Sequence, residues 1–260
     1  MSRTVVVATV GTTHPLAFAG LGFALLALAA DDIRPVCVVA GVSAQDGSCV
    51  LERAAVDAAT IRAQFAALRD TGVGAFHVGA LLTAEAVHAV ADGLATYPDV
   101  PAVVDPVLAA TGGDALADAA ALTALRDVLL RRATLLTPNL DEAGALLARP
   151  VANVGAMHDA ASALQALGAR AVLVKGGHLA GDAVDVLADA SGTRELRSPR
   201  VAGTMRGTGD LLAVTIAAWL ARGAELHESI ERARRRVGAA IASAVPFAGT
   251  RVASFAADSA

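Results

Sequence analysis

Cysteine, lysine and aromatic residues are all scarce in this sequence. Its two cysteines, Cys37 and Cys49, fit neither a disulfide framework nor the spacing of a metal site, which favours a reducing, cytoplasmic compartment. Aromatic residues make up 3% of the chain although 55% of it is hydrophobic, so we expect a core of small aliphatic side chains. At 260 residues the chain is long enough to bury such a core.

A long basic block is also lacking. The net charge is −4, so the composition does not indicate nucleic-acid binding. Glu228 and Glu231 each precede an arginine by four residues, which favours a solvated, salt-bridged helix face. The basic cluster on this expected helix consists of Arg232, Arg234, Arg235 and Arg236.

The apolar runs near the start of the chain are too short for a membrane span. Residues 21–30 fall well below the roughly 20 apolar residues that a spanning helix needs. A turn-like stretch at residues 11–15 separates them from the apolar residues 4–10. We therefore expect a buried strand, a loop and a buried helix, and no association with a membrane.

Several common catalytic and binding motifs are missing. The sequence has no Walker A motif, no Gly-x-Gly-x-x-Gly after the first expected strand, and no Gly-x-Ser-x-Gly nucleophile elbow. His14 and His178 lie in expected loops without a partner at metal-ligand spacing, so a zinc site is not expected. These absences disfavour the usual P-loop NTPases, dinucleotide-binding enzymes and serine hydrolases.

Strand-like and helix-like segments alternate along the whole chain, which predicts an α/β domain with a mostly parallel central sheet and helices on both faces. No linker or repeat divides it, so residues 1–260 are expected to form one domain. The expected strands are residues 4–10, 34–40, 75–78, 102–104, 133–136 and 171–174, with a hairpin at 184–188 and 193–198. The expected helices include residues 19–30, 51–68, 84–94, 122–130, 140–148, 156–167, 211–220 and 226–245. Residues 11–16 and 41–48 are expected to be loops.

The most informative motif is Gly207-Thr208-Gly209-Asp210, directly before an apolar helical segment. Free N–H groups and the helix dipole make such a helix start an anion site, and glycine allows a close approach. They should also keep Asp210 ionised, as a base beside a bound phosphate. The alternative is an ordinary acidic residue in the first helical turn, where acids are favoured in any case.

Other polar residues stand where expected strands end, and in such folds ligands bind beyond the carboxyl ends of the strands. These residues are Asp105, Asn139, Glu142, Lys175 and Asp210. Glu142 and Asp105 are plausible, partly water-mediated ligands of Mg²⁺. Alternatively, Asn139 and Glu142 only cap a helix. Lys175 is the only lysine of the chain, and a compact ammonium suits a phosphate; the alternative is that it persists by chance.

Taken in order, these motifs resemble the ribokinase-like superfamily, and within it the hydroxymethylpyrimidine/phosphomethylpyrimidine kinases of thiamine synthesis. The resemblance covers nearly the whole chain. It is carried by Gly41-Val42-Ser43-Ala44-Gln45-Asp46, Val103-Val104-Asp105-Pro106-Val107, Gly113-Asp114, Leu136-Thr137-Pro138-Asn139-Leu140-Asp141-Glu142-Ala143, Val172-Leu173-Val174-Lys175-Gly176-Gly177-His178 and Gly207-Thr208-Gly209-Asp210.

The resemblance implies a three-layer αβα fold and the transfer of the γ-phosphate of ATP, with Mg²⁺, to a small heteroaromatic alcohol or its monophosphate. It makes Gly207, Thr208 and Gly209 the anion hole for the phosphoryl group and Asp210 the base. Lys175, Asn139 and Thr208 would bind the nucleotide, and Glu142 and Asp105 the metal. Gln45, Gly11, Gly20 and Val107 would bind the substrate ring, and the enzyme would be a cytoplasmic homodimer.

Some positions depart from the family pattern. The pyrimidine kinases usually have cysteine at position 210, whereas aspartate there is similar to ribokinases and pyridoxal kinases. In the first loop, aligned from Pro15, a ring-binding aspartate becomes Ala24, a serine becomes Leu16, and two glycines become Ala17 and Phe18. The lysine usually found before Gly113-Asp114 is Thr111. The alternatives are a pyridoxal-type vitamin kinase and a catalytically weak protein that binds a pyrimidine or nucleotide.

Overall fold

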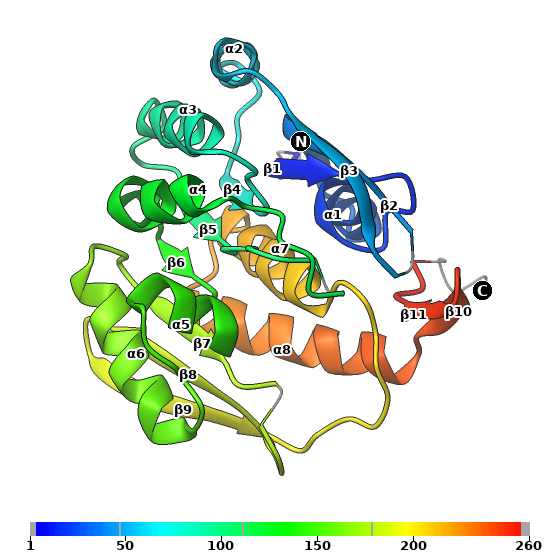
Figure 1. Cartoon of the computed structure of the whole chain (residues 1–260), viewed down its shortest axis with the longest axis vertical. Coiled ribbons are helices and arrows are strands. Elements are labelled where there is room, and N and C mark those ends of the chain that lie inside the picture. Colours follow the sequence, from blue (N-terminus) through cyan, green and yellow to red (C-terminus); the bar gives the residue numbers. More distant parts are fainter. Residues whose placement is uncertain (1–3, 47, 111, 178, 256–260) are drawn as a thin grey trace.

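A nine-stranded sheet forms the centre of the molecule (Figure 1). The computed structural model describes residues 4–46, 48–110, 112–177 and 179–255, so Thr111 and His178 lie outside the described residues. The strand order is β3-β2-β1-β4-β5-β6-β7-β8-β9, in which β2, β1, β4, β5, β6 and β7 are parallel and β3, β8 and β9 run antiparallel to their neighbours. The strands span Val6–Thr13 (β1), Arg34–Gln45 (β2), Val50–Ala55 (β3), Ala75–Val78 (β4), Ala102–Val104 (β5), Leu135–Leu136 (β6), Val172–Lys175 (β7), Ala183–Asp189 (β8) and Gly192–Ser198 (β9).

Helices cover both faces of this sheet. Helices α2 (Ala58–Ala67), α3 (Ala84–Ala95), α4 (Ala119–Ala124), α5 (Leu140–Leu147) and α6 (Val154–Ala166) pack on one face, and α4 continues through a π-helical turn, Leu125–Leu129, and a 3-10 turn, Leu130–Arg132. Helices α1 (Gly20–Ala29), α7 (Thr208–Ala221) and α8 (Leu226–Ala242) pack on the other. The predicted α/β class, the mostly parallel sheet and the three layers are confirmed.

Side chains that alternate along each strand supply the two cores. Val104, Leu136 and Val174 face α2–α6, whereas Val103 and Leu173 face α1, α7 and α8. The same alternation carries into the polar residues that follow the strands, and it therefore decides which of them meet. None of the described helices combines the length and apolarity needed to cross a bilayer.

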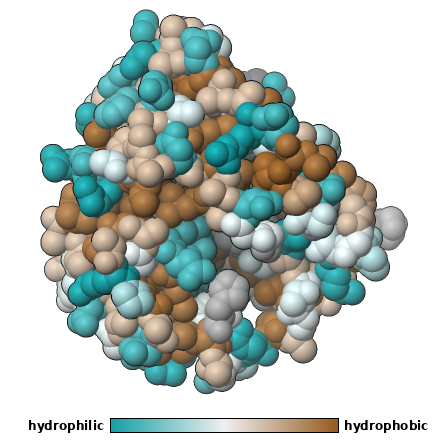
Figure 2. Space-filling model, in the orientation of Figure 1, coloured by the Kyte–Doolittle hydropathy of each residue, from teal (hydrophilic) through white to brown (hydrophobic). Residues whose placement is uncertain are grey.

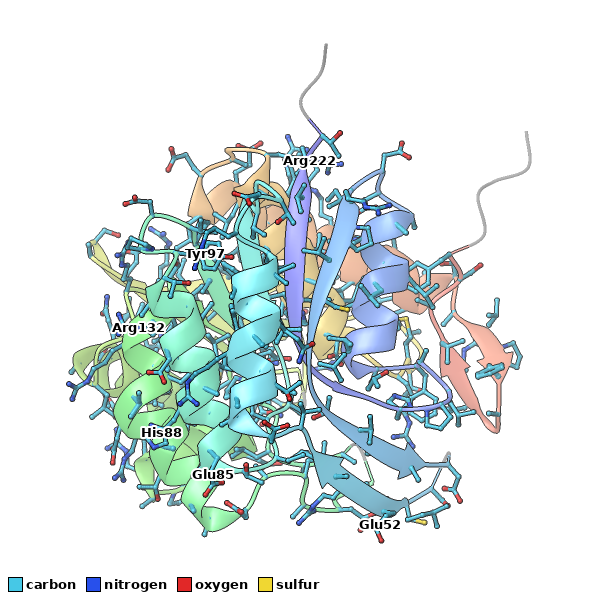
Figure 3. The ribbon with its side chains drawn as sticks, turned by 90° about the horizontal axis from the view of Figure 1, so that it is seen from above. Glu52, Glu85, His88, Tyr97, Arg132 and Arg222 are labelled. Carbon is cyan, nitrogen blue, oxygen red and sulfur yellow. The ribbon has the colours of Figure 1, made fainter. Side chains whose placement is uncertain are left out.

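Strands β2 and β3 form an antiparallel flap that the sequence analysis missed. Residues 41–48 were expected to be a loop, but β2 continues to Gln45; residues 51–55 were expected to begin a helix, but they form β3. The residues of β3 favour helix on their own, and pairing with the extended β2 overrides that preference. Figure 3 shows the flap, with Glu52, projecting from the body of the protein.

Two further boundaries differ from the prediction. Residues 11–13 belong to β1 rather than to a loop, and the pairing with β2 shifts register between Gly11 and Thr12. The last helix ends at Ala242, before a small hairpin of β10 (Val245–Phe247) and β11 (Thr250–Val252). The turn residues Ala248 and Gly249 both have positive φ, as a tight hairpin of this type requires.

The arginines of α8 are less solvated than predicted. Arg232 forms the expected surface pair with Glu228, with nitrogen and oxygen 2.7 Å apart. Arg234, however, is largely buried and pairs with Asp185 of β8 at 2.9 Å. Arg236 pairs with Asp31 at 2.6 Å. Arg234 and Arg236 therefore fasten α8 to the sheet and to the end of α1.

Candidate active site

Three polar side chains meet beyond the carboxyl ends of β5, β6 and β7, under the start of α7. The Lys175 ammonium lies 2.7 Å from Asp105 Oδ1, and the Thr137 hydroxyl donates to the same oxygen at 2.9 Å. Asp105, Thr137 and Lys175 each stand two residues after a core residue that faces α7, so alternation directs all three to the α7 side of the sheet. In Figure 3 this end of the molecule carries Glu52 and Glu85, and Arg222 lies at the opposite end.

The start of α7 closes over this pair of charges. Gly207 caps the helix with φ 76°, a left-handed conformation that favours glycine. A Cβ added to Gly209 would lie 3.2 Å from Lys175 Nζ and 3.3 Å from Asp105 Oδ2, so the backbone of the helix approaches both charged groups closely. Asp210 follows in the same turn, and its Oδ1 accepts a 3.1 Å hydrogen bond from the Gly20 N–H.

Asp210 is less acidic than the sequence predicts. Burial raises its pKa to about 7, and the negative charge of Asp105 adds to the rise. The Gly20 N–H and the Lys175 ammonium lower the pKa, but they do not compensate for burial. The expectation that Asp210 stays fully ionised is therefore wrong at neutral pH. A carboxyl with this pKa is better matched to proton transfer near neutrality than an ordinary aspartate.

Asn139 and Glu142 form the helix cap that the sequence offered as an alternative. The Glu142 N–H donates to Asn139 Oδ1 at 2.9 Å, and the Asn139 N–H donates to Glu142 Oε2 at 2.7 Å, which is a capping box. Burial raises the pKa of Glu142 to about 7 although Lys175 opposes the rise. The cap holds Glu142 near the charged pair, so a structural role and a role in the site are compatible.

Carboxyl groups outnumber the ammonium group among the described residues of this site. Asp105, Glu142 and Asp210 interact electrostatically with Lys175, so three carboxyl groups share one ammonium. Burial lowers the pKa of Lys175, but attraction to Asp105 and Glu142 outweighs this effect and raises it overall. The described residues contain no group of three or more acidic, histidine or cysteine ligands. The carboxyl excess nevertheless fits Mg²⁺, which takes few protein ligands and completes its shell with water and phosphate.

His77 and Thr9 belong to the same neighbourhood and were missed from the sequence. His77 is 1% exposed, and its Nδ1 shares a 2.9 Å hydrogen bond with the Thr9 hydroxyl. Burial lowers the pKa of His77 to about 4, so the ring is neutral at physiological pH. The sequence signal that could have found His77 is the alternation of side chains along a strand. His77 stands two residues after the core residue Ala75, just as Asp105 stands two residues after the core residue Val103, so both lie on the same face of the sheet.

The predicted substrate residues are distributed between Asp210 and the flap. Gly20 contacts Asp210 through its N–H. Gly11 packs against the backbone of Gly79 and Ala80, and Val107 packs beside Ala80. Gln45 lies at the end of β2, where its amide donates to Ser43 at 2.8 Å. The structure therefore brings Gly20 to Asp210 and places Gln45 on the flap.

Asp114 ties the flap to the loop after β5. Its Oδ2 accepts a 2.8 Å hydrogen bond from the Val50 N–H of β3, and Arg53 donates to the Ala115 carbonyl. The Gly113-Asp114 motif thus has a positional role in this structure. It fastens the strand that pairs with Gln45 above the sheet edge.

Comparison with known proteins identifies a family that this chain matches over most of its length. Residues 17–253 match the family described as phosphomethylpyrimidine kinase. A hydroxymethylpyrimidine/phosphomethylpyrimidine kinase from Streptomyces coelicolor is 40% identical over 233 residues, which are 89% of this chain and 86% of that protein. A chloroplastic bifunctional enzyme of thiamine biosynthesis from Arabidopsis thaliana is 36% identical over 240 residues, 90% of this chain and 46% of that protein.

Solved structures agree in fold. A phosphomethylpyrimidine kinase from Clostridium difficile is 26% identical with a TM-score of 0.81, covering 92% of this chain and 100% of the other. A pyridoxal kinase from Bacillus subtilis, in complex with ADP, is 28% identical with a TM-score of 0.85, covering 94% of both chains. The resemblance predicted from the motifs is confirmed.

Proposed function

The chain belongs to the phosphomethylpyrimidine kinase family and is therefore a phosphotransferase, and from this premise we propose that it transfers the γ-phosphate of ATP to hydroxymethylpyrimidine, to its monophosphate, or to both, in thiamine biosynthesis. The proposal treats residues 1–260 as one kinase domain. Its strongest support is the position of Asp210, a buried carboxyl of raised pKa, in the first turn of α7 and one residue from Gly209.

Asp210 is assigned as the general base. It accepts the proton of the substrate hydroxyl while the hydroxyl oxygen bonds to the γ-phosphorus and the bond from phosphorus to the β-phosphate bridge breaks, which releases ADP. The N–H groups of Gly207, Thr208 and Gly209 lie at the positive end of the α7 dipole and stabilise charge on the transferring group. Positioning and electrostatics of this kind are most of what phosphoryl transfer requires of a protein.

The remaining charged residues bind the nucleotide and its metal ion. Lys175 neutralises phosphate charge, and Asn139 and Thr208 complete the nucleotide site. Asp105 and Glu142 would hold Mg²⁺, since the carboxyl groups here outnumber the single ammonium of Lys175. The metal, when bound, neutralises charge that develops on the phosphates.

Substrate binding is assigned to Gly11, Gly20, Gln45 and Val107, between the base and the flap. The substrate is a small heteroaromatic alcohol. Family membership also motivates the proposal of a cytoplasmic homodimer. Sedimentation of the purified protein tests whether it is a dimer.

A pyridoxal-type vitamin kinase is the second candidate. It is supported by Asp210, which has the residue type of the pyridoxal kinases, and by the likeness to the Bacillus subtilis pyridoxal kinase. A third possibility is a protein that binds a pyrimidine or nucleotide with little turnover. It is motivated by the altered first loop and by Ala24, which lies in α1 and is fully buried.

A coupled assay of ADP release separates these candidates. Purified protein with Mg·ATP is offered hydroxymethylpyrimidine, its monophosphate, pyridoxal and a thiazole alcohol. The proposal expects the pyrimidines to give the highest kcat/KM, and Asp210→Asn to lower it by about 10²-fold or more. Asp99→Asn, at an exposed loop position, is the matched control. Preference for pyridoxal supports the second candidate, and binding without turnover supports the third.

A further inference from the structure

His14 is a buried side chain whose polar atoms are incompletely used by the fold. It directly follows β1 and is 7% exposed. Neither of its ring nitrogens has a partner at full hydrogen-bond geometry among the residues that the structure describes, and the one nearby contact, with the backbone of Ala19, is weak. A buried polar group without a full hydrogen bond is destabilising, so such groups normally have a partner in the functional state.

His14 also lies next to the proposed base. Its Cδ2 is 4.0 Å from the position of a Cβ built on Gly20, and the Gly20 N–H donates to Asp210 Oδ1. The substrate hydroxyl must lie within hydrogen-bond reach of Asp210 to lose its proton. The ring that carries this hydroxyl is therefore placed near His14.

The surroundings of His14 are otherwise apolar. Between residues 14 and 30, which form the first loop and all of α1, His14 is the only polar side chain. The Phe18 ring packs against His14 with centroids 4.6 Å apart, and Phe18 is itself almost fully buried. Ala24 offers nothing to a substrate, since it lies in the core beneath α7. Any hydrogen bond from this segment's side chains to a substrate must come from His14.

We propose that His14 is a specificity-determining residue that donates a hydrogen bond from its imidazole N–H to a ring nitrogen of the substrate. The inference rests on the proposed function, and it defines the substrate class as nitrogen heterocycles that accept a hydrogen bond. Burial lowers the pKa of His14 and outweighs the opposing contact with the Ala19 backbone, so the ring is neutral and has one donor and one acceptor nitrogen. Phe18 fixes the orientation of the imidazole from its other side.

The test compares hydroxymethylpyrimidine with two analogues in which one or the other ring nitrogen is replaced by CH. Affinity is measured by calorimetry without ATP, and kcat and KM are measured with ATP. In the natural protein, one analogue should bind about 10- to 100-fold more weakly than the parent, the equivalent of the 1–3 kcal/mol lost at an unpaired buried donor. His14→Phe should weaken binding of the parent by the same factor and abolish the discrimination.

Two further variants keep the test decisive. His14→Gln retains an N–H donor and should restore part of the discrimination, which a purely structural role for the ring would not do. His88→Phe, at an exposed position on α3 (Figure 3), is the matched control and should leave both affinities unchanged. If His14→Phe folds but discriminates as the natural protein does, the inference is overturned. If the parent binds with the expected discrimination but no phosphate is transferred, the proposed function fails and the inference stands.

Discussion

The Lys175 ammonium and the Asp105 carboxylate form an ion pair of 2.7 Å whose aspartate is only 2% exposed and whose lysine is 15% exposed. Asp105 also accepts from Thr137, so its Oδ1 is held by two donors. Because both charges are largely removed from water, each depends on the other for compensation. The pair therefore links the stability of the fold to the proposed nucleotide site.

Removal of Lys175 should destabilise the protein strongly. Lys175→Met leaves Asp105 buried beside Glu142 and Asp210 without a counter-charge, and the expected loss is about 3 kcal/mol or more of the free energy of unfolding. Urea denaturation at pH 7 measures it. The double variant Lys175→Met/Asp105→Leu removes both charges and should recover most of the loss. A double variant no more stable than the single one would show that the pair is not the source of the effect.

The pH dependence of catalysis should report Asp210. A base must be deprotonated to act, and the pKa of Asp210 is about 7, so kcat/KM for an unphosphorylated alcohol should fall about tenfold per unit as pH drops below 7. An unphosphorylated substrate is used because a phosphate monoester titrates near pH 6 by itself.

Glu142 provides the comparison, because burial raises its pKa to about 7 as well. Glu142→Gln should lower the rate but keep the acidic limb of the profile. Asp210→Asn should lose the limb together with most of the rate. If the limb disappears in Glu142→Gln and persists in Asp210→Asn, the base has been assigned to the wrong carboxyl group.

His77 should make the fold sensitive to acid. Its pKa is about 4 in the folded protein and 6.5 in the reference state, so the unfolded chain binds the additional proton between these values. The contribution of neutral, buried His77 to the free energy of unfolding is complete above pH 6.5. It is lost as pH falls towards 4, by about 3 kcal/mol in all. His77→Gln removes this titration. Urea denaturation at pH 7 and pH 4.5 should show a smaller decrease for the variant than for the natural protein; equal decreases would contradict a neutral buried His77.

The ends of the parallel strands could be predicted from the sequence, because each such strand is a continuous apolar segment that stops at a polar residue. Asp105 and Lys175 directly follow such segments, and alternation places both on the α7 side. Which acidic residue pairs with Lys175 was not predictable, because this depends on how far β5 and β7 extend beyond β6. His77 was missed because alternation indicates only the face of the sheet on which it lies, and its chemistry depends on neighbours from adjacent strands.

The flap was missed for a different reason. Residues 50–55 are mostly exposed and rich in helix-favouring side chains, so local propensity predicts a helix. Their strand conformation depends on pairing with β2, which lies outside any local window. Gln45 was thus assigned to a loop, whereas it stands at the end of a strand whose position Asp114 secures through Val50.

Loosening the flap should weaken substrate binding without weakening nucleotide binding. Asp114→Ala removes the acceptor of the Val50 N–H, so β3 should fray and the amides of residues 50–55 should exchange hydrogen about tenfold faster, the equivalent of about 1.4 kcal/mol for a hydrogen bond to a charged group. Because Gln45 pairs with Val50 across the flap, KM for the alcohol should rise while KM for ATP stays constant. Asp114→Asn keeps an oxygen that accepts from Val50 and should retain slow exchange and a low KM. Since the asparagine variant removes the charge but not the acceptor, equal effects of the two substitutions would mean that the charge of Asp114, rather than its bond to β3, governs the substrate site.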